Sequence, residues 1–163
     1  MSNAPNLADT GGRPRVGSAG ILVEDGKLMM GLSKKWNQWV IPGGAIDFLE
    51  SYKDAVVREI REETGLEVEW QSFAQVFEVM HAPTNNHRVL LYSNVKRVGG
   101  SINPGDDIAD VAFFDRAGLA KLADEGLLTG VMLEVLMGLG WLEETAERSR
   151  PGSNVWQDSK KAG

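Results

Sequence analysis

The chain has 163 residues, of which 42% are apolar and 25% are charged, a composition typical of one compact soluble domain. No apolar run reaches the ~20 residues that a membrane-spanning helix needs, and the polar start MSNAPNLADTGGRPR does not resemble a secretory signal, so we expect a cytoplasmic protein. A net charge of −6 disfavours a nucleic-acid-binding surface, and the lack of cysteine excludes disulfides, thiolate nucleophiles and cysteine-based zinc sites.

The N-terminal third is predicted to form a tail, a hairpin and a short strand. Residues 1–15, rich in Gly, Pro, Asn and charge, are expected to be a mobile tail. Apolar stretches flank Asp25-Gly26, a pair that type I′ turns prefer, which predicts a β-hairpin over residues 20–33. Residues 39–41, Trp-Val-Ile, are predicted to be a core strand that ends at Pro42-Gly43-Gly44.

A helix is predicted from Ser51 to Thr64. Ser51 and Asp54 have the spacing of a capping box at its start, and Gly65 stands where a left-handed cap would end it.

The rest of the chain predicts more strands and then helices. Because strands and helices do not alternate as βαβα, a doubly wound parallel sheet is disfavoured, and we expect one α+β domain over residues 16–147, a sandwich with a mixed sheet. The expected elements are strands over 67–80, 87–98 and 111–114, loops over 81–86 and 99–107, helices over 116–124 and 130–147, and a mobile tail over 148–163.

The predicted helix 51–64 separates acidic from apolar residues. At 100° per residue, Glu59, Glu62 and Glu63 share one arc, while an apolar stripe with Val56 and Ile60 lies elsewhere. Glu59 and Glu63 are an i, i+4 like-charge pair that destabilises an isolated helix by ~0.2–0.5 kcal/mol. Clustered carboxylates suit Mg²⁺ or Mn²⁺, although a solvated acidic face is the commoner explanation of such a pattern taken alone.

Residues before the helix favour the metal site. Gly43-Gly44 follows a strand and leaves the backbone open to a phosphate or a metal ion. The segment GAIDFLESYKDAVVREIREETGL, residues 44–66, resembles the Nudix box G-x5-E-x7-R-E-U-x-E-E-x-G-U, with U apolar, at all nine defined positions. The flanking residues extend this resemblance to about residues 16–142, and it implies a Nudix-like α/β/α sandwich.

The resemblance also implies a reaction and residue roles. Nudix hydrolases cleave a nucleoside diphosphate linked to another moiety, with Mg²⁺ or Mn²⁺ assisting attack of water on phosphorus. On this chain the implied metal ligands are Glu59, Glu62, Glu63 and the Gly43 carbonyl. Glu59 is also a candidate to act on the attacking water, with Arg58 orienting Glu59 and Glu50 supporting Arg58.

Family members often use a further carboxylate from a loop before a late strand. Asp110 is the first candidate here and Asp107 the second. A simple turn after Pro104-Gly105 explains the Asp106-Asp107 pair equally well.

Candidates for substrate contact lie outside the helix. Gly44 would allow close backbone approach, and Trp36 and Tyr92 could stack on a base, although packing is the commoner role for such aromatics. Arg88 is a candidate phosphate contact, as are Lys34 and Lys35, each with ordinary surface charge as the alternative.

The expected substrate is ADP-ribose or a nucleotide sugar. Relatives that hydrolyse ADP-ribose often carry a proline about sixteen residues after the box, and Pro83 lies seventeen after Leu66. The alternatives are a (d)NTP pyrophosphohydrolase, RNA cap removal, and a module that senses nucleotides without hydrolysis. A homodimer is also a possibility, since the apolar segment 130–142 could serve a partner as well as a core.

Overall fold

The computed structural model describes residues 12–145 of the chain. Within that range, seven strands form one sheet in the order β3-β2-β1-β6-β5, with β4 beside β1 and β7 beside β2. The β1–β6 pair is parallel and the other pairs are antiparallel, so the sheet is mixed as predicted. The strands are β1 (Arg15–Glu24), β2 (Lys27–Ser33), β3 (Trp39–Val40), β4 (Gly43–Ala45), β5 (Leu66–His81), β6 (Asn86–Gly100) and β7 (Ile108–Phe114).

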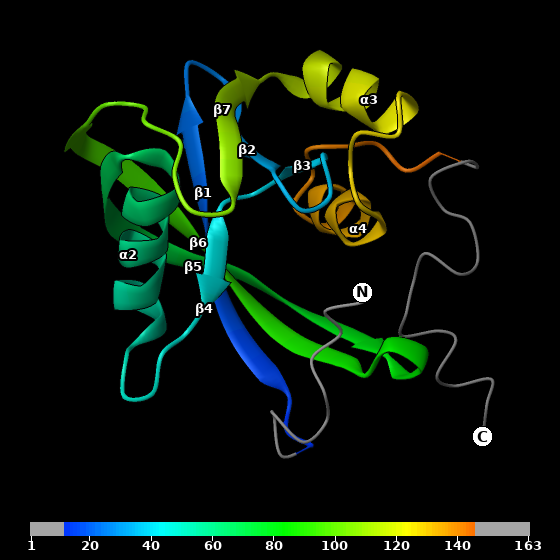
Figure 1. Ribbon diagram of the computed structural model, residues 1–163. Helices are drawn as coiled ribbons and strands as arrows, with labels where there is room; N and C mark the ends of the chain where they lie inside the picture. The colour runs from blue at the N-terminus through cyan, green and yellow to red at the C-terminus, as the bar shows by residue number, and fades with distance from the viewer. Residues whose placement is uncertain (1–11, 146–163) are drawn as a thin grey trace.

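Helices cover both faces of this sheet (Figure 1). On one face, α2 (Tyr52–Thr64) buries Val56 and Ile60 in a cluster with apolar side chains of β1, β2, β5, β6 and β7. On the other, α3 (Arg116–Asp124) and α4 (Gly130–Gly138) bury Leu119 and Leu136 in a second cluster. The predicted α/β/α sandwich is therefore confirmed. No helix in residues 12–145 has the length and apolar character needed to cross a membrane.

Local sequence signals account for the turns and caps that hold this arrangement. Asp25 and Gly26 both have positive φ, 51° and 73°, as a type I′ turn requires, so the predicted hairpin between β1 and β2 is confirmed. Ser51 caps α2, because its Oγ accepts the Asp54 N–H at 3.1 Å, and Gly65 ends the helix at φ 76°.

Several predicted boundaries are wrong. Gly99 and Gly100 lie in β6 and not in a loop, and a Cβ on Gly100 would come within 2.4 Å of the Gly65 carbonyl oxygen, so these glycines permit close strand pairing. The strand predicted at 111–114 begins at Ile108, which places Asp110 within β7. Arg15 already belongs to β1; otherwise the predicted tails lie almost wholly outside the described residues.

The helix predicted over 130–147 ends at Gly138. Gly140 follows with φ 77°, a conformation that a right-handed helix cannot include. The segment's apolar residues face inward, and Val135, Leu136 and Leu142 belong to the core cluster. Packing within the core therefore accounts for the apolar residues of segment 130–142, which the sequence alone could also have assigned to a dimer interface.

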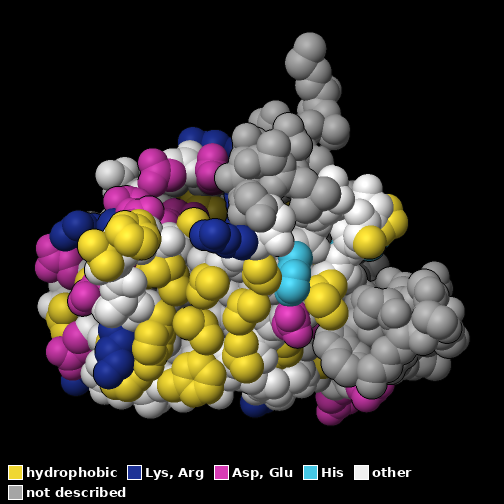
Figure 2. Space-filling view, turned by 90° about the horizontal axis from the view of Figure 1, so that it is seen from below, with side chains coloured by type: hydrophobic (Ala, Val, Ile, Leu, Met, Phe, Trp, Pro, Cys, Tyr) yellow, Lys and Arg dark blue, Asp and Glu magenta, His cyan; other side chains and the backbone are white. Residues whose placement is uncertain are grey.

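The sheet is longer than α2 and extends beyond the N-terminal end of that helix (Figure 1). In the view from below, apolar side chains gather on the surface (Figure 2). Val16, Phe73 and Val76, from β1 and β5, are each exposed to between 43% and 48%.

Candidate active site

Two glycines of β4 bring its backbone against the acidic side of α2. The Gly43 N–H donates to Glu63 Oε2 at 2.9 Å. A Cβ on Gly44 would lie 2.5 Å from the Glu59 carboxylate, closer than any ordinary contact, so only glycine fits there without displacement. The Gly-Gly pair thus places backbone directly over two of the three clustered glutamates.

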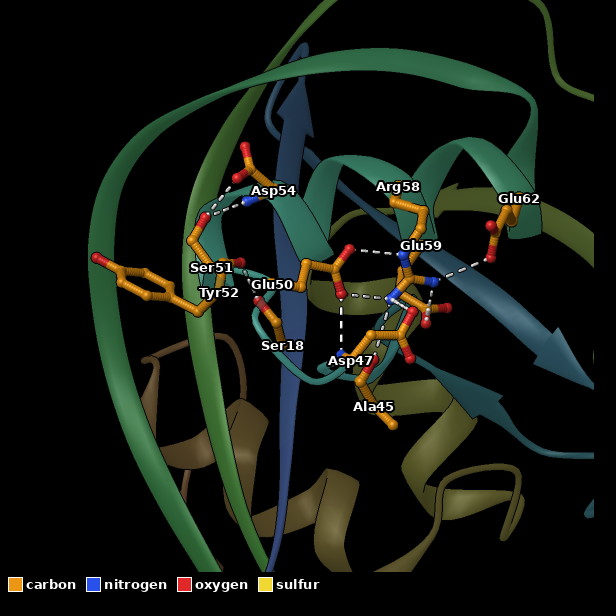
Figure 3. A network of polar contacts seen from close by, with 10 residues as sticks. All are labelled: Ser18, Ala45, Asp47, Glu50, Ser51, Tyr52, Asp54, Arg58, Glu59 and Glu62. Atoms are coloured by element: carbon orange, nitrogen blue, oxygen red, sulfur yellow. Dashed lines mark hydrogen bonds and ion pairs between the residues drawn. The ribbon is translucent and has the colours of Figure 1, made fainter.

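Arg58 binds most of the neighbouring carboxylates (Figure 3). Its guanidinium forms a two-pronged pair with Glu50, with Nε–Oε1 and Nη2–Oε2 distances of 2.7 and 2.9 Å. Nη1 also donates to Glu59 at 2.8 Å and to Glu62 at 3.2 Å. The hydrogen bonds between Arg58 and Glu50 lower the pKa of Glu50 to about 2. Glu50, Arg58 and Glu59 are therefore brought together, and their roles in catalysis stay predictions.

Burial raises the pKa of two carboxyl groups of this cluster. The pKa of Glu63 is raised to about 8 by burial, with the charges of Glu59, Asp107 and Asp106 contributing to the shift and the Gly43 hydrogen bond opposing it. Burial also raises the pKa of Glu59, despite the opposing effect of Arg58. A site where several carboxylates resist ionisation lacks positive charge, which a divalent cation would supply.

The donor set fits a hard divalent cation, since only carboxylate and backbone oxygens converge here. Within residues 12–145, no three carboxylate or histidine side chains are already close enough to hold a metal ion. In this structure Arg58 contacts Glu59 and Glu62, and Glu63 accepts the Gly43 N–H. The ligand roles of Glu59, Glu62, Glu63 and Gly43 stay predictions.

The loop after β6 brings two aspartates to this cluster. Its backbone is tied to the C-terminal end of α2, with Gly105 N–H donating to the Glu63 carbonyl at 3.1 Å, and Lys34 Nζ donates to the Asp106 carbonyl at 2.7 Å. Asp106 and Asp107 then lie near enough to raise the pKa of Glu63. Asp110 instead lies exposed on β7, where its Oδ1 accepts the Val111 N–H at 2.8 Å.

This arrangement brings Asp106 and Asp107, and not Asp110, into the surroundings of Glu63. The sequence left catalysis and a plain turn after Pro104-Gly105 as equal explanations of the aspartate pair, and the catalytic roles of all three aspartates stay predictions. The hydrogen bond between that turn and α2 is a tertiary contact that local patterns do not contain.

The predicted substrate contacts lie in different surroundings. Trp36 is 47% exposed and free to stack, whereas Tyr92 is 3% exposed and packs edge-on against Phe77, with ring centroids 5.5 Å apart. Tyr92 is therefore a core residue, and the structure favours its packing role over base stacking. Arg88 is half-buried on the sheet, and Lys35 lies over the Trp36 ring.

The chain resembles known proteins over most of its length. A family model, the NUDIX domain, matches residues 13–130. An ADP-ribose pyrophosphatase of Methanocaldococcus jannaschii is 33% identical over 114 residues, which cover 68% of this chain and 67% of that protein.

Solved structures show the same fold. A UDP-X diphosphatase superposes with a TM-score of 0.63 at 21% identity, covering 80% of this chain and 68% of its own. A bifunctional NMN adenylyltransferase/ADP-ribose pyrophosphatase from Francisella tularensis, complexed with AMP and a manganese ion, gives a TM-score of 0.59 at 17% identity, covering 77% and 42%. Taken with the domain match and the clustered carboxylates, these likenesses show that the chain belongs to the Nudix family and is a Nudix pyrophosphohydrolase.

Proposed function

We propose that this protein hydrolyses the diphosphate linkage of ADP-ribose or a nucleotide sugar with Mg²⁺ or Mn²⁺ as its cofactor. The observation that carries the proposal is the buried Glu63 carboxylate, whose pKa is raised to about 8 beside Glu59, Asp106 and Asp107. A buried carboxyl that resists ionisation for want of positive charge is suited to a divalent cation, which would favour its ionised form.

In this proposal the cation is held by Glu59, Glu62, Glu63 and the Gly43 carbonyl. When bound, it would neutralise phosphate oxygens and promote ionisation of the attacking water. The chain's own residues prepare this site. Glu50 holds Arg58 by two hydrogen bonds, and Arg58 in turn fixes the Glu59 carboxylate beneath Gly44. Because Gly44 has no side chain, the Glu59 carboxylate can lie directly against the β4 backbone.

Hydrolysis joins the water oxygen to one phosphorus while the bridging oxygen leaves on the other phosphate, and a base must accept the proton from water. Glu59 is one candidate, and Asp107 and Asp110 are the others given by the sequence. Asp106 joins these candidates, because its loop is held against α2 by the hydrogen bond from the Gly105 N–H to the Glu63 carbonyl. Separate asparagine variants at 106, 107 and 110 would identify the base by the largest loss of kcat.

The substrate class is supported by similarity and by available side chains. The relative from Methanocaldococcus jannaschii, 33% identical, is named an ADP-ribose pyrophosphatase. Trp36 is exposed and lies two residues after Lys34 in the sequence. Lys34 donates a hydrogen bond to the Asp106 carbonyl, so the segment that carries Trp36 is attached to the loop beside the carboxylate cluster. We propose stacking of the substrate base on Trp36 and phosphate contact by Arg88.

A substrate panel with product identification tests the proposal. ADP-ribose, UDP-sugars, dinucleoside polyphosphates, and normal and oxidised (d)NTPs would be incubated with the protein and Mg²⁺ or Mn²⁺, and ¹⁸O-labelled water would show which phosphorus is attacked. Highest kcat/KM for ADP-ribose or a nucleotide sugar supports the proposal. Preference for (d)NTPs would establish the alternative, and tight binding without turnover under any metal would indicate a sensing module.

A further inference from the structure

Two arginines lie side by side on the face of the sheet that carries α4. Arg15 of β1 and Arg88 of β6 are register partners on neighbouring parallel strands. Side chains alternate along a strand, and Ala19 and Tyr92, four residues further on in each strand, belong to the core cluster under α3 and α4. Arg15 and Arg88 therefore point to that same face.

No carboxylate in the described part of the chain pairs with either arginine. Among residues 12–145, no ion pair or side-chain hydrogen bond of Arg15 or Arg88 is formed, and the Arg88 Nε is shielded from solvent without a partner. Burial lowers the pKa of Arg88, and the charge of Arg15 lowers it further. By contrast, Arg58 contacts Glu50, Glu59 and Glu62. Adjacent like charges without a counter-ion destabilise a strand pair, so a bound anion would relieve the pair.

The pair lies within reach of the active site. Ser18 is the register partner of Gly44, and Arg15 precedes Ser18 by three residues, a separation of roughly 10 Å along the strand. The residue between them on the same face as Arg15 is Gly17, and a Cβ there would lie 3.0 Å from Leu90 Cδ2 and 3.2 Å from the Gly44 carbonyl oxygen. No side chain of β1 itself stands between Arg15 and the β4 backbone, and on β6 the side chain of Leu90 lies beside Gly17.

We propose that Arg15 and Arg88 together bind a phosphate group of the substrate, on the opposite side of the β4 glycines from the carboxylate cluster. The guanidinium fork matches a phosphate in a way that a lysine ammonium does not, and two forks on adjacent strands can grip one group from two directions. This inference rests on the proposed function, because it assigns a part of the substrate. In this inference the arginine pair contributes to substrate affinity, whereas residues of α2 carry out the chemical step.

Direct binding and kinetics test the pair independently. Binding of inorganic phosphate and pyrophosphate to the metal-free protein would be followed by chemical-shift perturbation, and KM and kcat would be measured with ADP-ribose. Arg15→Gln and Arg88→Gln should each weaken anion binding and raise KM at least about tenfold, with kcat within about threefold. Arg88→Lys, which keeps the charge but loses the fork, should fall between Arg88→Gln and the parent protein.

Lys96→Gln is the matched control, because Lys96 is an exposed residue of β6 and its loss changes the net charge equally. It should leave phosphate binding and KM as in the parent protein. If Arg88→Gln does not fold, Arg15→Gln decides the question, because Arg15 is exposed at the start of β1. Parent-like anion binding and KM in the arginine variants would overturn the inference while hydrolysis itself stands. If phosphate binding depends on the arginines but no diphosphate is hydrolysed, the anion site at Arg15 and Arg88 is supported and the proposed hydrolase function is contradicted.

Discussion

Replacement of Gly44 by alanine tests whether the position of Glu59 controls activity. The added Cβ would lie 2.5 Å from the Glu59 carboxylate, whereas ordinary contacts begin at 3.4 Å, so the two groups must separate by about 1 Å. Gly44 is not at positive φ, so alanine introduces no backbone strain there. Because the end of a glutamate side chain can move, we expect little loss of stability. A displacement of about 1 Å at a reacting group can cost on the order of 100-fold in rate.

The assay compares kcat/KM and thermal unfolding for three glycine-to-alanine variants. Gly44→Ala should lose about 100-fold in kcat/KM while its Tm stays near that of the parent protein. Gly20→Ala should do the reverse, because its Cβ would lie 2.3 Å from Ile60 Cδ1 in the core, an overpacking that costs about 1–3 kcal/mol. Gly130→Ala meets nothing within 4 Å and should change neither quantity appreciably.

This set separates loss of folding from loss of the site. A fully active Gly44→Ala variant would refute the reasoning, since Glu59 would then tolerate displacement without effect. A Gly44→Ala variant whose Tm falls as far as that of Gly20→Ala would show that β4 moves instead of the carboxylate. Either result would remove the argument that the glycine serves the chemistry.

Four further outcomes are expected. Glu63→Gln should lower the rate at least ~100-fold, and chelation with EDTA should abolish activity that Mg²⁺ or Mn²⁺ then restores, measured by product release. Because Arg58 lowers the folded-state pKa of Glu50 to about 2, this pair stabilises the protein above the unfolded value near 4.5, and that stability is lost as the pH falls toward 2. Urea titrations from pH 6 to 2 should show a smaller loss in Glu50→Gln; equal losses would contradict the pairing. Ser51→Ala should cost about 1 kcal/mol in the same titrations at neutral pH, because the Asp54 N–H loses its cap.

Local patterns predicted α2 closely. Its cap at Ser51, its end at Gly65 and its division into apolar and acidic sides all depend on residues within a few turns, and each agrees with the structure. The hairpin at Asp25-Gly26 was predictable for the same reason, because the turn itself requires those residue types.

Contacts between distant segments explain where sequence reasoning failed. The sequence pattern of Gly99-Gly100 is typical of a loop. In the structure these glycines pair closely with Leu66 and Glu67 of β5, a contact that the local sequence does not contain. Asp106 has no distinctive local pattern, and it lies near Glu63 because tertiary hydrogen bonds, including those from Asn103 and Gly105 to the last turn of α2, hold its loop there. Tyr92 looks available for stacking until α4 and Phe77 cover it. These features arise from tertiary packing, which a local pattern cannot reveal.

The balance of charge around α2 explains why one helix face can serve both folding and catalysis. Glu50 is satisfied by Arg58, so its charge stabilises the fold, whereas Glu63 is buried with Asp106 and Asp107 nearby and has only a backbone N–H as partner. Its raised pKa leaves the Glu63 carboxyl largely neutral at pH 7 in the free protein, and a fold selected for stability alone would gain from an apolar residue at 63, because burying a polar group with few hydrogen bonds is costly. Retaining a carboxyl group there is understandable if a cation completes the site, because binding of the cation would then stabilise the folded protein.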